Sequence, residues 1–315
     1  MYTPIQKICE AENNISIYMK REDLLPFSFG GNKVRIATEL YNDMIQKEMN
    51  CMIGYGNSRS NMCRTIANIC CREQVPCHII SPADDNGERI NTNNSVLVEA
   101  SGAVIHKCYK SNVKETVSRI IDECTKDGLK PYYMYGNADG SGNETVLSKA
   151  YIDVYHEITE QEIELNISFD YIFLACGTGM TQSGLVIGDQ IYEGGKKIIG
   201  ISVARQADAE KKVIKNYVKS YADLYNMDDS VKNIFVTDNY LCGGYGEYSQ
   251  ELLNVIRYVY FNYGIALDTT YTGKAYWGMI DFIKKNGIAD KNVLFIHTGG
   301  LPIFFDKFNE IFGGK

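Results

Sequence analysis

Residues 171–184 have the sequence YIFLACGTGMTQSG, which predicts a buried strand, a glycine-rich turn and the start of a helix. A helix N-terminus after such a turn offers backbone N–H groups to a phosphate. The positions of Gly177, Gly179 and Gly184 do not fit the G-x-G-x-x-G pattern of dinucleotide folds, and no G-K-[ST] closes a nucleotide-binding loop. A phosphate monoester without a nucleoside therefore fits this turn best.

Short apolar runs alternate with longer amphipathic segments on both sides of this turn. The predicted strands are 51–55, 77–81, 103–108, 171–175, 197–203 and 292–297. The predicted helices are 61–73, 89–100, 209–221, 248–263 and 274–285. Repeated β-α-β units of this kind predict an α/β protein of two lobes, with twisted, mainly parallel sheets flanked by helices.

The composition limits the possible partners. The net charge of -7 argues against a nucleic-acid partner, and no apolar stretch is long enough to cross a bilayer. With no signal peptide after Met1, we expect a cytoplasmic protein that acts on a small molecule. The ten cysteines contain no C-x-x-C pair and no Cys/His spacing typical of a zinc site, so we expect reduced core residues and no metal.

Lys33 stands in the run FGGNKVR at residues 29–35, where two glycines and an asparagine precede its amine. Taken alone, a lysine is usually a surface charge. Beside a loop suited to a phosphate monoester, Lys33 suggests pyridoxal 5'-phosphate held as a Schiff base, because that cofactor combines one phosphate with an aldehyde that reacts with amines.

In this order the motifs resemble those of fold-type II pyridoxal-phosphate enzymes similar to tryptophan synthase β, and within that group the D-cysteine desulfhydrase and 1-aminocyclopropane-1-carboxylate deaminase family. The motifs that carry the resemblance are KREDL at 20–24, GGNKVR at 30–35, SN at 60–61, the Gly177 loop, LDTTYTGK at 267–274 and HTGG at 297–300. The resemblance covers nearly the whole chain. It implies a homodimer, with an active site in the cleft between a large cofactor-binding domain (1–40 and 145–315) and an inserted small α/β domain (41–144).

The resemblance also implies roles for individual residues. Lys33 forms the Schiff base and later moves protons, Asn61 binds the phenolic oxygen of the cofactor, and Ser60 binds the substrate carboxylate. The alternative for Ser60 and Asn61 is an ordinary helix N-cap. The phosphate is expected at the backbone N–H groups and hydroxyls of Gly177, Thr178, Gly179, Met180 and Thr181.

Thr298 and two tyrosines complete the expected site. The Thr298 hydroxyl is expected to face the pyridine nitrogen, where an alcohol gives a weaker electron sink than a carboxylate and suits β-elimination better than transamination. Its neighbour His297 is expected to be structural. Tyr245 and Tyr271 match the family's active-site pair, and Thr272 stands where cyclopropane deaminases place a glutamate, which favours the desulfhydrase branch.

The sequence therefore predicts a pyridoxal-phosphate-dependent lyase or deaminase that catalyses α,β-elimination, with D-cysteine as the leading substrate and pyruvate, ammonia and sulfide as products. Ser60 and Tyr271 both stay open as the group that protonates the leaving sulfur. Two other reactions also stay open: deamination of 1-aminocyclopropane-1-carboxylate, and β-replacement on a larger or acidic amino acid whose extra carboxylate binds Arg59. A non-catalytic scaffold is disfavoured because the lysine and the phosphate loop are both present.

Overall fold

The computed structural model describes residues 1–83, 90–229 and 234–313. The chain divides into two compact units, of which the first comprises Met1–Asn32 and Ser148–Lys315 and the second comprises Lys33–Leu147. The limits expected from the sequence, 40/41 and 144/145, differ from these by eight and three residues. No helix in the described part of the chain is long and apolar enough to span a membrane.

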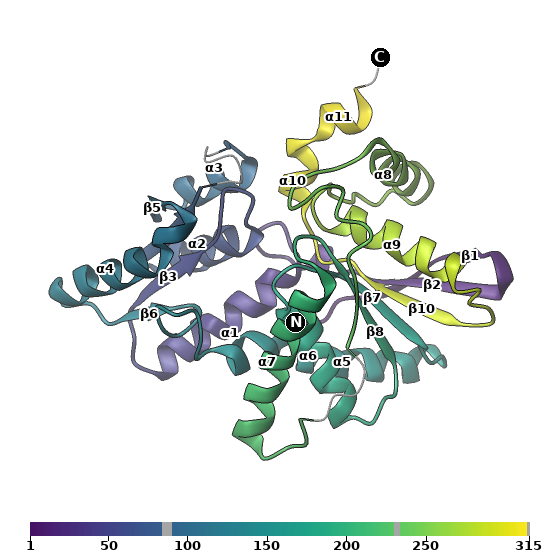
Figure 1. The fold of residues 1–315 in the computed structure, drawn as a ribbon, viewed down its shortest axis with the longest axis horizontal. Helices are drawn as coiled ribbons and strands as arrows, with labels where there is room; N and C mark the ends of the chain where they lie inside the picture. The colour runs from purple at the N-terminus through teal and green to yellow at the C-terminus, as the bar shows by residue number, and fades with distance from the viewer. Residues whose placement is uncertain (84–89, 230–233, 314–315) are drawn as a thin grey trace. The chain divides into compact units, whose positions relative to one another are not determined.

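A six-stranded sheet forms the centre of the first unit (Figure 1). Its strands pair in parallel, except that β1 and β2 are antiparallel. In spatial order they are β1 (Ile5–Ala11), β2 (Ile15–Lys20), β10 (Asn292–Ile296), β7 (Tyr171–Cys176), β8 (Lys197–Ser202) and β9 (Phe235–Thr237). The apolar run that predicted β7 is almost entirely buried, as expected of a central strand covered on both faces.

Helices cover both faces of this sheet (Figure 1). Helices α6 and α7 connect β7 to β8 and β8 to β9, which moves the chain in one direction along the sheet. Helices α8 and α9 lie in the connection from β9 back to β10, which runs in the opposite direction. Because such crossovers are right-handed, the two pairs of helices lie on opposite faces of the sheet. The helices are α5 (Glu144–Leu165), α6 (Met180–Ile191), α7 (Ala207–Tyr225), α8 (Gln250–Tyr263), α9 (Thr272–Lys285), α10 (Leu301–Asp306) and α11 (Phe308–Phe312).

The strand order of this sheet reverses between β7 and β10, which are parallel neighbours. Ligands of open α/β sheets bind beyond the carboxyl ends of the strands at such a reversal. The turn after β7 contains Gly177 and Gly179, and the turn after β10 contains Thr298. The topology of the first unit therefore places the predicted phosphate loop beside Thr298.

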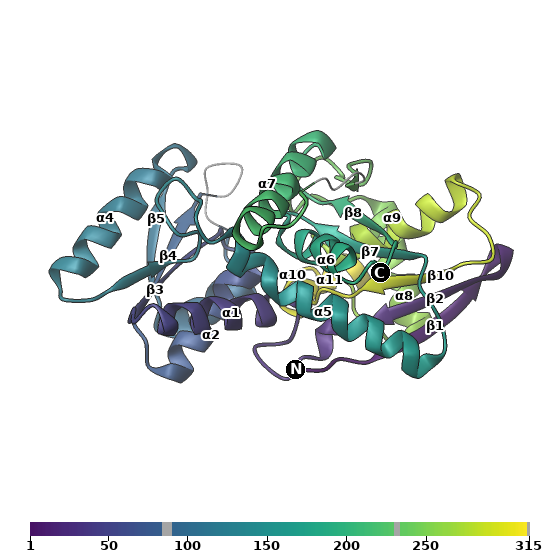
Figure 2. The same cartoon turned by 90° about the horizontal axis from the view of Figure 1, so that it is seen from below.

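The second unit is built on a parallel four-stranded sheet in the order β5 (Val104–Cys108), β4 (Cys77–Pro82), β3 (Cys51–Tyr55) and β6 (Pro131–Tyr133). Its helices are α1 (Asn32–Gln46), α2 (Asn61–Glu73), α3 (Asn93–Ala100) and α4 (Val113–Lys126). The step from β5 back to β6 reverses direction, so α4 covers the face opposite to α2 (Figure 2).

The structure confirms the α/β class and most of the predicted elements, with ends shifted by a few residues. The helix predicted at 89–100 begins at Asn93, and Arg89 lies outside the described residues. The sequence pattern was not used to predict strands β1, β2, β6 and β9 or helices α1, α4, α5, α10 and α11. Helix α4 has a clear apolar face all the same, with Val117, Ile120 and Cys124 buried.

Candidate active site

Asn32 joins three of the predicted motifs in the first unit. Its backbone N–H donates to the carbonyl of Thr298 at 3.1 Å, and its side-chain Nδ2 donates to Thr181 Oγ1 at 2.8 Å. Asn32 is buried, so the loss of either bond would leave an unsatisfied polar group. The G-G-N turn, the loop after β7 and the end of β10 thus form one hydrogen-bonded assembly, and Lys33 is the next residue of the chain.

Two glycines let backbone segments touch in this assembly. Gly31 and Gly299 have φ angles of +97° and +90°, in the region that favours glycine. A Cβ on Gly31 would lie 2.7 Å from the Thr298 carbonyl oxygen, and a Cβ on Gly299 would lie 2.5 Å from Gly31 Cα. Gly31 is therefore required by the close approach of this turn to the chain after β10, whereas Gly30 is packed against the Asp23 carbonyl.

The loop after β7 presents donors suited to a phosphate. Gly179 has a φ angle of +77° and precedes the first residue of α6, and the Ser183 N–H makes an intrahelical bond to the Gly179 carbonyl at 2.8 Å. The N–H groups before Ser183 have no partner within the helix, and they lie at the positive end of its dipole. This donor set fits a phosphate monoester, and Gly177, Thr178, Gly179, Met180 and Thr181 would hold it.

An ion pair between exposed Arg205 and buried Glu210 supports the same loop. Arg205 donates through Nη1 to the Gly177 carbonyl and pairs through the same nitrogen with Glu210 Oε2 at 2.9 Å. Glu210 is fully buried, and its Oε1 accepts a bond from the Cys176 thiol at 3.2 Å. Burial, with the carboxylate of Glu210 beside it, raises the pKa of Cys176, which keeps this thiol protonated rather than nucleophilic. Sequence reasoning missed this support because neither charge belongs to a motif.

His297 has a structural role, as the sequence predicted. Its Nδ1 accepts from the Gly299 N–H at 3.2 Å, so its Nε2 carries the proton and donates to the Ala266 carbonyl at 2.9 Å. Both ring nitrogens are thereby used to hold the turn that carries Thr298. Thr298 itself is buried in this turn, and the pairing of its hydroxyl with a pyridine nitrogen stays a prediction.

Asp268 organises the segment that carries Tyr271. Its Oδ1 accepts from the backbone N–H groups of Thr270 at 2.8 Å and Tyr271 at 2.7 Å. Its Oδ2 accepts from Thr272 N–H at 3.1 Å and from the Thr272 hydroxyl at 2.7 Å, and that hydroxyl in turn accepts from the Asp268 N–H at 2.8 Å. Thr272 is fully buried and bonded to Asp268, so its hydroxyl holds the start of α9.

Tyr245 and Tyr271 meet through their hydroxyls, which share a short hydrogen bond. Their rings are edge to face, with centroids 5.8 Å apart. The structure thus brings together the two tyrosines that the family resemblance singled out from the 23 in the chain. A proton on either phenol can pass to the other, which suits a group that donates to a leaving atom.

Lys274, which the sequence left unassigned, positions the loop that carries Tyr245. The Lys274 side chain is buried, and Nζ donates to the carbonyls of Leu241 at 2.7 Å and Gly244 at 2.8 Å. Burial lowers the pKa of Lys274 to about 8. The sequence does place Lys274 in the first turn of a helix with an apolar face. The same pattern also fits a lysine whose amine lies in solvent, so it does not predict this role.

In the second unit Ser60 caps helix α2. Its Oγ accepts from the Cys63 N–H at 3.1 Å, so the helix-cap alternative is correct for this residue. A Cβ on Gly56 would lie 2.6 Å from Ser60 Oγ, so the glycine at the end of β3 makes room for this hydroxyl. A role in binding the substrate carboxylate stays a prediction that the cap does not contradict, because a hydroxyl can accept one bond and donate another.

Asn61 is the first residue of α2 and has a fixed amide orientation. Its Oδ1 accepts from Asn94 Nδ2 at 2.9 Å, with Arg64 Nη2 3.5 Å away, and Arg64 Nε donates to Asn94 Oδ1 at 2.9 Å. Arg64 is buried, and desolvation lowers its pKa to about 10, still well above neutral pH. With Oδ1 used as the acceptor, the Nδ2 of Asn61 remains the donor end, as binding of a phenolate oxygen would require.

The comparisons with known proteins agree with this fold. The chain matches the family described as "Pyridoxal-phosphate dependent enzyme" over residues 2–299 and belongs to that family. It is therefore an enzyme that uses pyridoxal phosphate, of fold type II, in the lyase and deaminase group.

Relatives carry two different activities in their names. The chain is 28% identical to "D-cysteine desulfhydrase" of Yersinia pestis (strain Pestoides F) over 310 residues, covering 96% of this chain and 92% of the relative. It is 29% identical over 315 residues, 98% of this chain and 92% of the relative, to a Pyrococcus abyssi protein named provisionally as a 1-aminocyclopropane-1-carboxylate deaminase. A crystal structure described as an "ACC deaminase homologue" matches 99% of this chain and 94% of its own, with a TM-score of 0.87 and 27% identity.

Proposed function

We propose that this enzyme eliminates sulfide from D-cysteine. Water completes the reaction, and the products are pyruvate, ammonia and sulfide. The observation that carries the choice of reaction is Thr272, whose hydroxyl is locked onto buried Asp268. A glutamate at that position, as in cyclopropane deaminases, would lose both bonds and bring a second carboxylate against a fully buried one.

The reaction suits a weak electron sink. When bound, pyridoxal phosphate withdraws electrons from Cα of an amino acid and makes its α-proton acidic. Opening a cyclopropane ring leaves the charge on carbon, whereas β-elimination transfers it to a departing sulfur. An alcohol such as that of Thr298 would be a sufficient partner for the pyridine nitrogen during elimination, and the chain supplies no carboxylate at position 272.

We assign the proton transfers to two parts of the chain. Lys33 takes the α-proton, as the resemblance implies for the lysine of the G-G-N-K turn. The Tyr245–Tyr271 pair gives a proton to the leaving sulfur, which is supported by the hydrogen bond between the two hydroxyls. Ser60 binds the substrate carboxylate and Asn61 orients the cofactor ring, a proposal supported by the fixed amide of Asn61.

The assembly around Asn32 supports the assignment of Lys33. Asn32 bonds both to the phosphate loop and to the turn after β10, and it immediately precedes Lys33 in the chain. A lysine anchored next to a phosphate site meets the positional requirement of a covalent cofactor link.

A second reaction is favoured by Arg59. This residue lies in the loop before Ser60, where its backbone N–H donates to Asn57 Oδ1 at 3.1 Å and its carbonyl accepts from Asn94 Nδ2 at 3.0 Å. A guanidinium on a loop fixed in this way suits a substrate with a second carboxylate, as in β-replacement on a larger or acidic amino acid.

Parallel assays test the proposal. D-cysteine, L-cysteine, D-serine and 1-aminocyclopropane-1-carboxylate are supplied separately, and ammonia, 2-oxo acid and sulfide are measured. We expect D-cysteine to give all three products at the highest kcat/KM. Turnover of the cyclopropane acid alone would refute our interpretation of Thr272, and activity only with a dicarboxylic amino acid plus a second substrate would favour replacement.

We further propose a homodimer in the cytoplasm. The compartment is supported by the ten cysteines, all of which are free thiols. The dimer is proposed from the family resemblance, and sedimentation of the purified holoenzyme would test it.

A further inference from the structure

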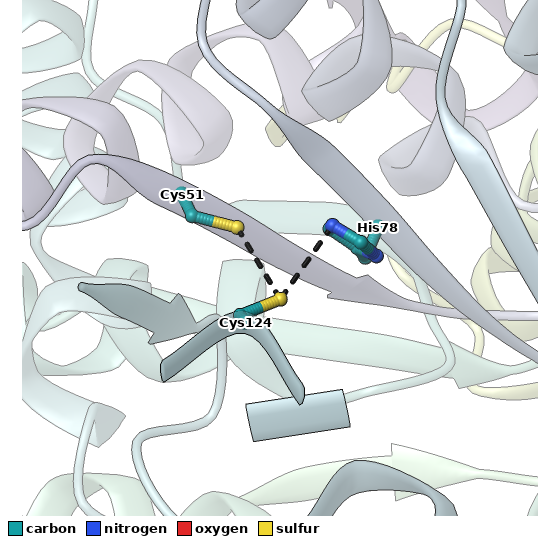
Figure 3. A group of neighbouring side chains, drawn as sticks. All are labelled: Cys51, His78 and Cys124. Carbon is teal, nitrogen blue, oxygen red and sulfur yellow. Dashed lines mark hydrogen bonds between the residues drawn. The ribbon is translucent and has the colours of Figure 1, made fainter. Parts of the chain in front are cut away.

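Three metal-binding side chains meet inside the second unit, and none of them belongs to a motif of the proposed active site (Figure 3). Cys51 begins β3, His78 lies in β4, and Cys124 is near the end of α4. The Sγ atoms of Cys51 and Cys124 are 3.8 Å apart, and Cys124 Sγ is 3.6 Å from His78 Nε2. All three ligand atoms lie within 4.8 Å of one another.

These distances match the edges of a zinc coordination polyhedron. A tetrahedral zinc ion about 2.3 Å from thiolate sulfur and about 2.0–2.1 Å from histidine nitrogen keeps two sulfurs about 3.8 Å apart and a sulfur and a nitrogen about 3.6 Å apart. The Cys51–Cys124 and Cys124–His78 edges need almost no change to receive the ion, and the third edge, from Cys51 Sγ to the His78 ring nitrogen, is at most 4.8 Å long. A disulfide, in contrast, needs the sulfurs about 2.05 Å apart.

The surroundings of His78 orient it as a ligand. Its Nδ1 is 2.9 Å from His106 Nε2 on the neighbouring strand β5, and the two ring planes differ by 13°. If Nε2 of His78 faces an ion, Nδ1 carries the proton and His106 accepts it, which is the usual arrangement behind a metal-binding histidine.

The two cysteines enter the site as thiols. Both are free cysteines. An ion that binds here must therefore displace two protons, which selects a metal that bonds strongly to sulfur over magnesium or calcium.

We propose that Cys51, His78 and Cys124 bind one zinc ion, with His106 as the positioning residue and a water molecule as the fourth ligand. The site contains none of the residues assigned to cofactor or substrate, and it links β3, β4 and α4 within one unit. Its role is to stabilise the second unit.

Zinc content and coordination test the proposal directly. The holoenzyme is incubated with zinc chloride, dialysed, and measured by elemental analysis and zinc X-ray absorption. We expect one zinc per chain, with two sulfur scatterers at about 2.3 Å and one imidazole nitrogen at about 2.0 Å. No retained zinc, coordination by oxygen and nitrogen alone, or a Cys51–Cys124 disulfide in protein purified without reductant would overturn the proposal.

Matched variants locate the ion. Cys124→Ser should lose the zinc and the rise in melting temperature that zinc gives the wild type, whereas Cys71→Ser, which changes an exposed thiol on α2, should keep both. His106→Phe keeps a ring but removes the acceptor, and we expect zinc affinity to fall about 10–100-fold in competition with a chelator. The absorbance of bound pyridoxal phosphate checks that each variant folds. Equal zinc affinity in all four proteins would contradict the site, whatever the substrate of the enzyme proves to be.

Discussion

Replacement of Lys274 by methionine tests whether this buried amine holds Tyr245 in place. Lys274 Nζ donates to the carbonyls of Leu241 and Gly244, which belong to the loop that precedes Tyr245. Methionine fills a similar volume but cannot donate, so the loop loses its anchor while the core of α9 keeps its packing. We expect kcat to fall about 100-fold, because a displacement near 1 Å of a catalytic group has that effect.

At pH 7, Lys274→Met should change the free energy of unfolding only a little. Two hydrogen bonds from a charged donor contribute about 1.5–3 kcal/mol each. Against them stands the cost of burying the charge, which lowers the pKa of Lys274 from 10.5 to about 8 and corresponds to about 3 kcal/mol. The two effects largely offset each other, and the free energy of unfolding of Lys274→Met should lie within about 2 kcal/mol of the wild type.

The pH dependence of stability separates these effects. Because the pKa of Lys274 is lower in the folded state, the unfolded chain binds the proton more tightly between pH 8 and 10.5, and stability from this group rises with pH. Between pH 7 and about 9.5, urea unfolding should show the wild type gaining about 2 kcal/mol relative to the variant. Lys285→Met, on the exposed end of the same helix, should show neither effect. An unchanged kcat, or a stability difference independent of pH, would refute the role of Lys274.

Three further substitutions address the first unit. Gly299→Ala puts a Cβ 2.5 Å from Gly31 Cα and should lower stability by about 2–4 kcal/mol with loss of bound cofactor, whereas Gly102→Ala, with a similar φ but open space, should cost about 1 kcal/mol in thermal or urea unfolding. Asp268→Asn turns a donor toward backbone N–H groups and should cost about 2–4 kcal/mol and reduce kcat; a wild-type melting curve would contradict this. Tyr271→Phe should lower kcat for D-cysteine about 100–10,000-fold without changing the cofactor absorbance, and equal rates would assign proton donation elsewhere.

The sequence predicted the parts of this protein that depend on local pattern. Contiguous apolar residues identified β7, and the glycines at 177 and 179 identified the turn that leads into α6. The tyrosines 245 and 271 came from the family resemblance, and their hydrogen bond supports that choice. The two glycines before Lys33 form a recognisable motif, but the contacts that require them, of Gly30 with Asp23 and of Gly31 with the turn after β10, are visible only in three dimensions.

The contacts that were missed join residues distant in the chain. Arg205 and Glu210 are ordinary surface types by sequence, and only the fold places them under the phosphate loop. The thiols of Cys51 and Cys124 are separated by 73 residues, so no local Cys/His spacing could reveal their meeting with a histidine. Thr272 was interpreted as favouring a desulfhydrase over a cyclopropane deaminase, which has a glutamate at this position. The hydrogen bond from the Thr272 hydroxyl to buried Asp268 explains why a glutamate would not fit there.

The central claim is that Lys33 carries the cofactor, and peptide mapping tests it most directly. The purified holoenzyme is reduced with borohydride, digested, and analysed by mass spectrometry. We predict that the visible absorbance is lost and that one pyridoxyl-phosphate group is found on Lys33, while Lys33→Ala carries no covalent label. A label on another lysine, or a wild-type protein that binds no pyridoxal phosphate, would contradict the account.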